Sequence, residues 1–225
     1  MKKIITLLTI LISANVIAQT LPNNDLENWV TEDSYEIPQG WETSNEASSQ
    51  WNSTLTCEKT TDAYSGNYAA KLTTKNLLFS FTSPGFITTG RFEFNALTQT
   101  AELYGGNYFP HRPEKITGHF KYSPGQSGDN CVVGAFLLKY TGGSISDTVG
   151  MAEFYETNTI DTYTYFEADF QYFTQDTPDS LQLTVLSTDF DNPVDQSVMY
   201  VDDLSIQMPT GHKINLMDEN NISIY

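Results

Sequence analysis

The sequence predicts an all-β protein built as an antiparallel β-sandwich, and three observations point to it. Short runs alternate apolar and polar side chains, as in 166–172 and 181–185, which is typical of strands with one buried face. Clusters of Gly, Pro, Asn, Asp and Ser separate these runs at the spacing of a sandwich. No window keeps a helical apolar period. We therefore expect about ten strands and few, short helices.

The expected strands follow one another along most of the chain. They cover residues 54–59, 68–73, 86–94, 116–122, 132–140, 151–155, 166–172, 181–185 and 200–206. Turn-forming residues favour loops at 83–85, 105–107, 123–130, 142–143 and 191–193. Nothing divides the chain after the first 18 residues, so we expect a single domain over 19–208.

The first 18 residues have the features of a cleaved signal peptide. Met1-Lys2-Lys3 is basic, residues 4–14 are mostly apolar, and Val16-Ile17-Ala18 offers a small-residue cleavage site. We expect cleavage after Ala18 and a secreted or cell-surface protein. The apolar run is too short to span a bilayer, and no later run approaches about 18 apolar residues, so no membrane insertion is expected.

The charge balance argues against two classes of partner, nucleic acid and anionic membrane surfaces. The chain has 11 basic and 28 acidic residues, and removing Lys2 and Lys3 with the signal peptide leaves 9 − 28 = −19. Nucleic acid and anionic membrane surfaces both need a basic footprint. Two interpretations of the acids stay open: a solubilising surface charge, or carboxylates that hold divalent cations.

Two cysteines, Cys57 and Cys131, both fall in or beside expected strands. A disulfide between them would close a loop of about 75 residues and stabilise the fold by about 4 kcal/mol. The alternative is a pair of buried thiols.

The C-terminal residues suggest a targeting signal. Met208-Pro209 ends the last expected strand, and Ile222-Ser223-Ile224-Tyr225 follows a polar stretch. These last four residues resemble the first strand of the C-terminal sorting domain of the type IX secretion system. The resemblance implies that 209–225 is a linker into such a domain, recognised by type IX secretion machinery. An ordinary disordered tail is the alternative.

Several short segments resemble the "putative carbohydrate metabolism domain" family of exported bacterial proteins. They are Leu26-Glu27-Asn28-Trp29, Pro38-Gln39-Gly40-Trp41, the run 64–70, Arg112-Pro113 with 118–122, and Val201-Asp202-Asp203-Leu204. The resemblance implies a jelly-roll sandwich similar to galactose-binding-like and xylan-binding modules. In such modules an early Glu, backbone oxygens of a Ser-Gly turn and a late Asp commonly enclose a structural calcium ion.

Transferred to this chain, the resemblance implies a structural Ca²⁺ bound by Glu27 and Asp202, with oxygens supplied around Tyr64, Ser65 and Asn67. An independent argument concerns Asp202. If its strand alternates, Asp202 shares an apolar face with Tyr200, Leu204 and Ile206, where a carboxylate needs a cation or several donors. The alternatives are backbone donors, or a bulge that turns Asp202 to solvent.

Two other groups of possible metal ligands are weaker. Asp189, Asp191, Asn192 and Asp195 begin like a calcium loop, but Pro193 and Tyr200 occupy positions where that loop needs other residues. This cluster is interpreted as a solvated turn. The three histidines show no ligand spacing for zinc.

Sugar binding requires flat apolar faces together with amide, guanidinium and carboxylate groups. The candidates are Trp51 beside Asn52, and the loop residues Tyr104, Asn107, Tyr108, His111 and Arg112. Trp29 and Trp41 are interpreted as core. Alternatives remain for two candidates, because Trp51 could cap the edge of the core and Arg112 could form a structural ion pair.

The leading function is non-catalytic binding of a glycan or polysaccharide, in its recognition or utilisation. One alternative is a glycoside hydrolase-like enzyme, which needs two facing carboxylates; Glu93, Glu153 and Glu167 lie in or beside expected strands. A surface adhesin or structural module is the other alternative. The sequence lacks the Gly-x-Ser-x-Gly motif of serine hydrolases and any glycine-rich phosphate loop.

Overall fold

The structure is a computed structural model, and it describes residues 21–32, 34–50, 54–77, 81–95, 98, 100–142 and 145–209. Three predictions concern residues outside this set: the signal peptide, the Trp51-Asn52 pair and the sorting segment from residue 210. Within the described part, no helix is long and apolar enough to cross a membrane.

The secondary structure of the described residues is almost entirely β, as predicted. The single helix, α1 (Asn45–Ser48), has four residues. The strands are β1 (Trp29–Glu32), β2 (Tyr35–Pro38), β3 (Glu42–Thr43), β4 (Cys57–Thr60), β5 (Ala69–Thr73), β6 (Lys75–Asn76), β7 (Thr82–Ser83), β8 (Phe86–Thr88), β9 (Arg91–Asn95), β10 (Thr100–Tyr104), β11 (Asn107–Tyr108), β12 (Lys115–Ser123), β13 (Cys131–Gly142), β14 (Ile145–Glu156), β15 (Ile160–Asp169), β16 (Gln171–Tyr172), β17 (Ser180–Leu186) and β18 (Val198–Gln207).

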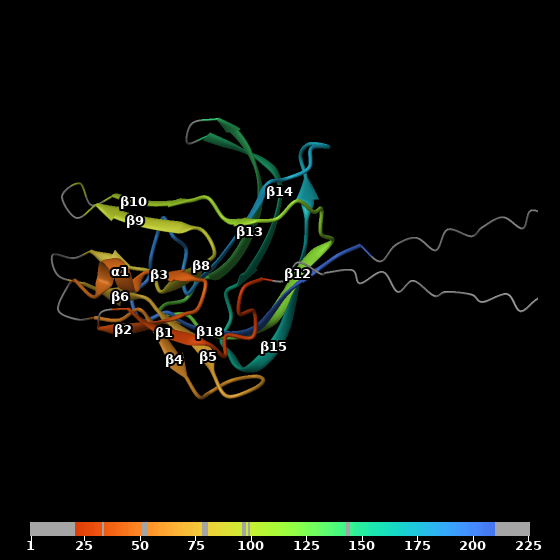
Figure 1. Cartoon of the computed structure of the whole chain (residues 1–225). Helices are drawn as coiled ribbons and strands as arrows, with labels where there is room; N and C mark the ends of the chain where they lie inside the picture. Colours follow the sequence, from red (N-terminus) through yellow and green to blue (C-terminus); the bar gives the residue numbers. More distant parts are fainter. Residues whose placement is uncertain are drawn as a thin grey trace, which may run out of the picture.

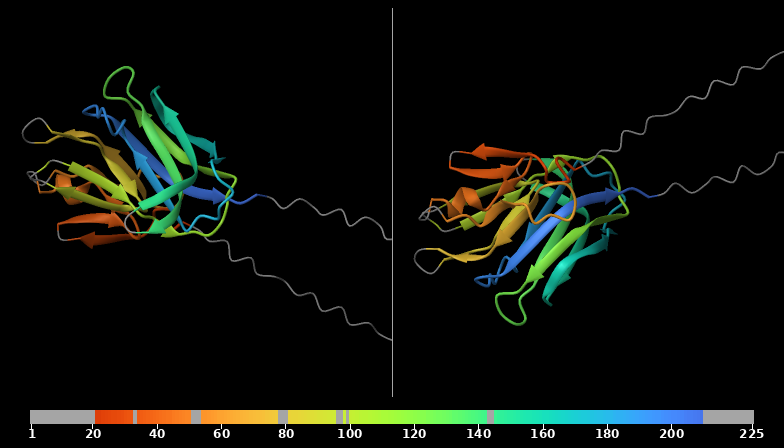
Figure 2. Two further views of the ribbon diagram at one scale, coloured as in Figure 1. Left: turned by 90° about the horizontal axis from the view of Figure 1, so that it is seen from above. Right: turned by 90° about the horizontal axis from the view of Figure 1, so that it is seen from below.

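Two antiparallel sheets form the sandwich (Figure 1). The five-stranded sheet has the order β15-β12-β18-β5-β4, and Figure 2 shows β18 in blue between β12 and β5. The seven-stranded sheet has the order β16-β14-β13-β17-β8-β3, with β11 paired to β17. Because most neighbours in a sheet are distant in sequence, the chain crosses repeatedly between the layers, as in a jelly roll. The predicted fold class is confirmed.

The core lies between the two sheets and follows the predicted alternation. Val133, Ala135 and Leu137 of β13 face it from the larger sheet, and Phe120 of β12 and Phe166 of β15 face it from the smaller one. The rings of Phe120 and Phe166 lie 5.9 Å apart, edge to face. Such rings bury the largest apolar areas, so they carry much of the sandwich's stability.

The two cysteines and two of the tryptophans belong to this core. Cys57 and Cys131 are buried as free thiols, which agrees with the second of the two alternatives. Burial raises the pKa of Cys131 to about 12 and also raises that of Cys57, so neither is a reactive thiolate at neutral pH. Trp41 is buried and Trp29 packs against the cluster, as expected.

One predicted strand, 86–94, is wrong as a single element. The chain forms β8, breaks at Thr89-Gly90, and starts again as β9. Thr89 is held on β17, since its N–H donates to the Leu183 carbonyl at 2.9 Å and its Oγ1 accepts from the Leu183 N–H at 2.9 Å. After this anchor the chain leaves the large sheet and forms the β9–β10 hairpin, which lies beside β8 (Figure 1).

Candidate functional site

The residues proposed to bind calcium do meet in the folded chain, around the loop 64–68. Asp202 on β18 accepts hydrogen bonds at Oδ2 from the N–H groups of Tyr64 (2.8 Å) and Ser65 (2.9 Å). Its Oδ1 accepts from the N–H of Asp203 at 2.7 Å. The late acid is thus fixed to the early loop by backbone donors.

Glu27 binds the other end of the same loop. Its Oε1 accepts from the N–H groups of Asn67 (2.7 Å) and Tyr68 (2.8 Å), and its Oε2 accepts from the Asn67 side-chain amide (3.1 Å). The N–H of Tyr68 contributes most to lowering the pKa of Glu27. We call the Glu27 carboxylate, the 64–68 loop and the Asp202 carboxylate the carboxylate clamp.

Gly66 is required at the centre of the clamp. Its φ is +63°, and a Cβ at this position would lie 2.3 Å from Oε1 of Glu27. Both the backbone conformation and the close approach of the carboxylate therefore exclude a side chain.

The predicted face of Asp202 needs correction. The register of β12 and β18 shifts between His119 and Thr117, opposite Asp203, whose φ is +52°. This bulge changes the alternation, so Val201 and Leu204 both face the core. Asp202 instead lies beneath the 64–68 loop, where it is fully buried. Desolvation outweighs its hydrogen bonds and raises its pKa.

A calcium ion would need carbonyl oxygens from the loop, whereas the loop presents N–H groups to both carboxylates. The described residues contain no group of three or more His, Cys, Asp or Glu that could hold a metal. Backbone donors, one of the stated alternatives, thus satisfy Asp202 in this geometry. Calcium at the clamp remains a prediction.

Two of the predicted sugar-binding residues, Tyr104 and Asn107, share a pocket of about 550 Å³. Arg91, the cross-strand partner of Tyr104, and Glu42 also line it. The Tyr104 ring is 37% exposed, and its hydroxyl donates to Glu93. We call this the hairpin-base pocket, since it lies where the β9–β10 hairpin begins and ends.

The other predicted sugar-binding residues that the structure describes lie outside the lining of this pocket. Tyr108 is largely exposed on β11, next to β17, and His111 is exposed, with its ring at 5.6 Å from that of Phe109. The Arg112 guanidinium lies 3.9 Å from the centre of the Tyr172 ring and donates to the carbonyls of Thr174 and Asp176. These contacts support a structural role for Arg112, with carbonyls in place of the expected acid.

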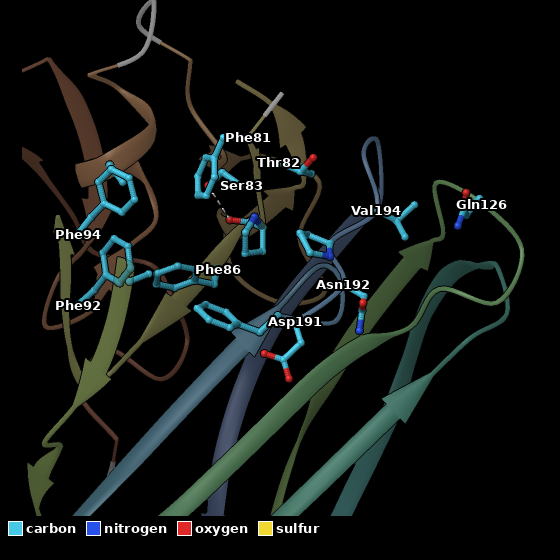
Figure 3. Close-up of a pocket in the computed structure, with 15 residues that line it drawn as sticks. Phe81, Thr82, Ser83, Phe86, Phe92, Phe94, Gln126, Asp191, Asn192 and Val194 are labelled. Carbon is cyan, nitrogen blue, oxygen red and sulfur yellow. Dashed lines mark hydrogen bonds between the residues drawn. The ribbon is translucent and has the colours of Figure 1, made fainter. Parts of the chain in front are cut away.

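Sequence reasoning missed a larger cavity of about 630 Å³ beneath the β9–β10 hairpin (Figure 3). We call it the phenylalanine pocket, after the rings that line it: Phe81, Phe86, Phe92, Phe94 and Phe190. Asp191 and Asn192 form another part of its wall. They belong to the acidic turn of the sequence analysis, in which Asp189 Oδ1 accepts from the N–H groups of both.

The pocket forms because the hairpin is amphipathic. Phe92, Phe94, Ala101 and Leu103 point toward a small apolar cluster, and the residues between them point to solvent. The alternation of apolar and polar residues in 91–95 indicated that one face of this strand is buried. The residues that it packs against are distant in sequence, so the pocket itself could not be predicted.

The three glutamates considered for catalysis are separated by their environments. Glu167 pairs with Lys115, which lowers the pKa of Glu167. Glu93 accepts from Tyr104. Desolvation raises the pKa of another acid, Glu46, and the nearby carboxylates of Glu42 and Glu93 add to this shift. Glu153 is exposed on β14.

No family model matches the chain, and no curated protein matches it by sequence. Its structure is similar to that of a protein from Bacteroides thetaiotaomicron described as a "putative glycoside hydrolase", with TM-score 0.69 and 17% identity over 84% of this chain and 71% of that chain. A second protein with the same description, from Bacteroides vulgatus, has TM-score 0.66 and 18% identity over 81% of this chain and 96% of that chain. At these identities the likeness shows a shared fold, the antiparallel β-sandwich.

Proposed function

We propose that this protein is an exported, non-catalytic module that binds carbohydrate. The proposal is supported by the jelly-roll sandwich and by its likeness to two proteins described as putative glycoside hydrolases. The acidic composition is consistent with a neutral partner such as a glycan or polysaccharide. Export is supported by the signal-peptide features of residues 1–18, and type IX sorting by residues 222–225.

The hairpin-base pocket is the observation that carries the proposal. A pyranose ring has an apolar face that stacks on an aromatic ring, and hydroxyls that both donate and accept. The pocket combines the exposed Tyr104 ring with the Arg91 guanidinium, the Asn107 amide and the Glu42 carboxylate. Glu42 Oε2 accepts from the N–H of Phe92 at 2.5 Å, which fixes this acid in place.

Glycan-array screening followed by titration calorimetry tests the proposal. We expect Tyr104→Ala and Arg91→Ala each to weaken the best ligand by about tenfold or more, since each removes a central stacking or charged contact. Tyr165→Ala is the matched control, because Tyr165 is also partly exposed but lies on β15 of the five-stranded sheet, outside the pocket lining. Equal affinity for the wild-type protein and both pocket variants would refute this site.

Glycoside hydrolysis is a second candidate, favoured by a pocket of about 480 Å³ that Glu46 and Glu93 both line. Burial, and then the nearby carboxylates of Glu42 and Glu93, raise the pKa of Glu46. A protonated acid and an ionised partner are the pair that this reaction needs. Release of reducing ends from a polysaccharide, lost in Glu46→Gln, would establish the enzyme. If neither binding nor hydrolysis is found, the adhesin or structural interpretation remains.

A further inference from the structure

The phenylalanine pocket is separate from the proposed sugar site and has different chemistry. Its volume of about 630 Å³ lies within the range of roughly 300–1,000 Å³ that is usual for small-molecule sites. Its lining combines five phenylalanine rings with alanines, prolines and Val194, and the polar residues Thr82, Ser83, Gln126, Asp191 and Asn192 complete it. The five rings distinguish this cavity from the hairpin-base pocket, whose aromatic lining residues are Trp41 and Tyr104.

The rings of the wall are held in place by one another. Phe86 and Phe92 pack edge to face, with their centres 4.8 Å apart at an interplanar angle of 78°. Phe81 and Phe94 lie 5.7 Å apart. Phe86 and Phe92 are also buried in the small cluster with Ala47 and Leu186. The apolar wall is therefore formed before any ligand arrives, which favours binding.

The remaining wall comes from the loop after β17. Phe190 is 40% exposed, so it borders the opening rather than the floor. The N–H groups of Asp191 and Asn192 donate to Asp189 Oδ1 at 2.8 and 3.2 Å, which fixes the turn that carries these side chains. Figure 3 shows Asp191 and Asn192 on the side of the pocket away from Phe92 and Phe94.

Charge and ring geometry select the ligand. A carboxylate in the wall and a net charge of −17 disfavour an anion, such as a fatty acid or an aromatic acid. Aromatic rings prefer edge-to-face or offset contacts with other rings, and a wall of five phenylalanines supplies both edges and faces. We propose that the phenylalanine pocket binds a neutral aromatic small molecule of one or two rings.

Titration of the mature protein with 2-naphthol, a neutral two-ring probe, tests the proposal. Phe190→Ala should weaken binding by about tenfold, because an aromatic contact at the opening is lost. Ala101→Phe should abolish it by filling the cavity from β10. Phe173→Ala is the matched control, since Phe173 is 57% exposed and does not line the pocket; it should bind like the wild-type protein.

Two further ligands test the selectivity. Naphthalene-2-sulfonate has the same rings with a negative charge, and decan-1-ol is neutral but aliphatic; both should bind at least tenfold more weakly than 2-naphthol. Equal binding of either one, no binding of 2-naphthol, or unchanged binding in both pocket variants would overturn the proposal. Tyr104→Ala should leave 2-naphthol binding unchanged, so this result is independent of the sugar site.

Discussion

The carboxylate clamp and the β9–β10 hairpin hold peripheral segments in opposite ways. The clamp fixes a loop on the five-stranded sheet through hydrogen bonds of 2.7–3.1 Å to two acids. The hairpin is held near the larger sheet by apolar side chains. Hydrogen bonds are directional and close to a fixed distance, so the clamp is filled by its own groups. Packed rings have no such requirement, and a cavity of about 630 Å³ remains beneath the hairpin.

The largest effect should come from removing the apolar packing that holds the β9–β10 hairpin. Phe92→Ala removes a buried ring that joins the hairpin to the small cluster. We expect a loss of about 4 kcal/mol in the free energy of unfolding, measured by urea denaturation. Phe173→Ala, with its exposed ring, should change the free energy by less than about 0.5 kcal/mol. A similar small change for Phe92→Ala would mean that the hairpin is held by other contacts.

Removing the hydrogen bonds of the carboxylate clamp should have the next largest effect. Asp202→Ala leaves the N–H groups of Tyr64, Ser65 and Asp203 without their acceptor. Asp202 itself is fully buried, and several hydrogen bonds to a charged group are lost together, so we expect a loss of about 3 kcal/mol and a melting temperature lower by about 10 °C. Asp169→Ala is the control, because its carboxylate is exposed and makes only a 3.6 Å ion pair. If the two variants have the same melting temperature, the clamp does not stabilise the fold.

Chelation separates the two descriptions of the clamp. The hydrogen-bonded geometry needs no cation, and it predicts that EDTA shifts the melting temperature by less than about 1 °C. Calcium at this site stays a proposal, and it predicts a fall of several degrees that added Ca²⁺ reverses. Calorimetry with and without EDTA, on wild-type protein and on Asp202→Ala, distinguishes them. If an ion is bound at the clamp, EDTA should lower the melting temperature of the wild-type protein and leave that of Asp202→Ala unchanged.

The smallest effect concerns pH. The pKa of Glu27 is lower in the folded protein than its usual value near 4.5, so its contribution to stability is present above that value and is lost as the pH falls below it. The pKa of Asp202 is raised, so protonation of Asp202 opposes this loss. Glu27→Gln should therefore flatten the fall in melting temperature below about pH 4.5. An unchanged acid profile would show that Glu27 contributes nothing through its charge.

Most strands were accessible from the sequence, for local reasons. Alternation in 181–185 lies within β17, and that in 116–122 lies within β12. The clamp residues came from the resemblance of short motifs to a family, which implied a calcium site; hydrogen bonds from backbone donors were stated only as the alternative for Asp202. The face of Asp202 was not predictable, since the bulge at Asp203 depends on how β18 pairs with β12.

Other features depend on contacts between distant residues. The phenylalanine pocket gathers rings from 81 to 190, and no local pattern links them. Asp129 lies in the expected turn between β12 and β13, but nothing local predicted that its buried carboxylate accepts from the hydroxyls of Tyr122, Thr188 and Ser197. Each of these donors is ordinary in its own segment, and only the tertiary fold brings them together.

The start of the described chain is bonded directly to its last strand, and this has a mechanical consequence. Asn24 accepts from the N–H of Leu204 and donates to its carbonyl, both at 2.9 Å, close to the clamp residues Glu27 and Asp202. Tension applied at residues 21 and 209 would load these two hydrogen bonds directly. Force applied at these two residues would thus be resisted at one small joint beside the clamp.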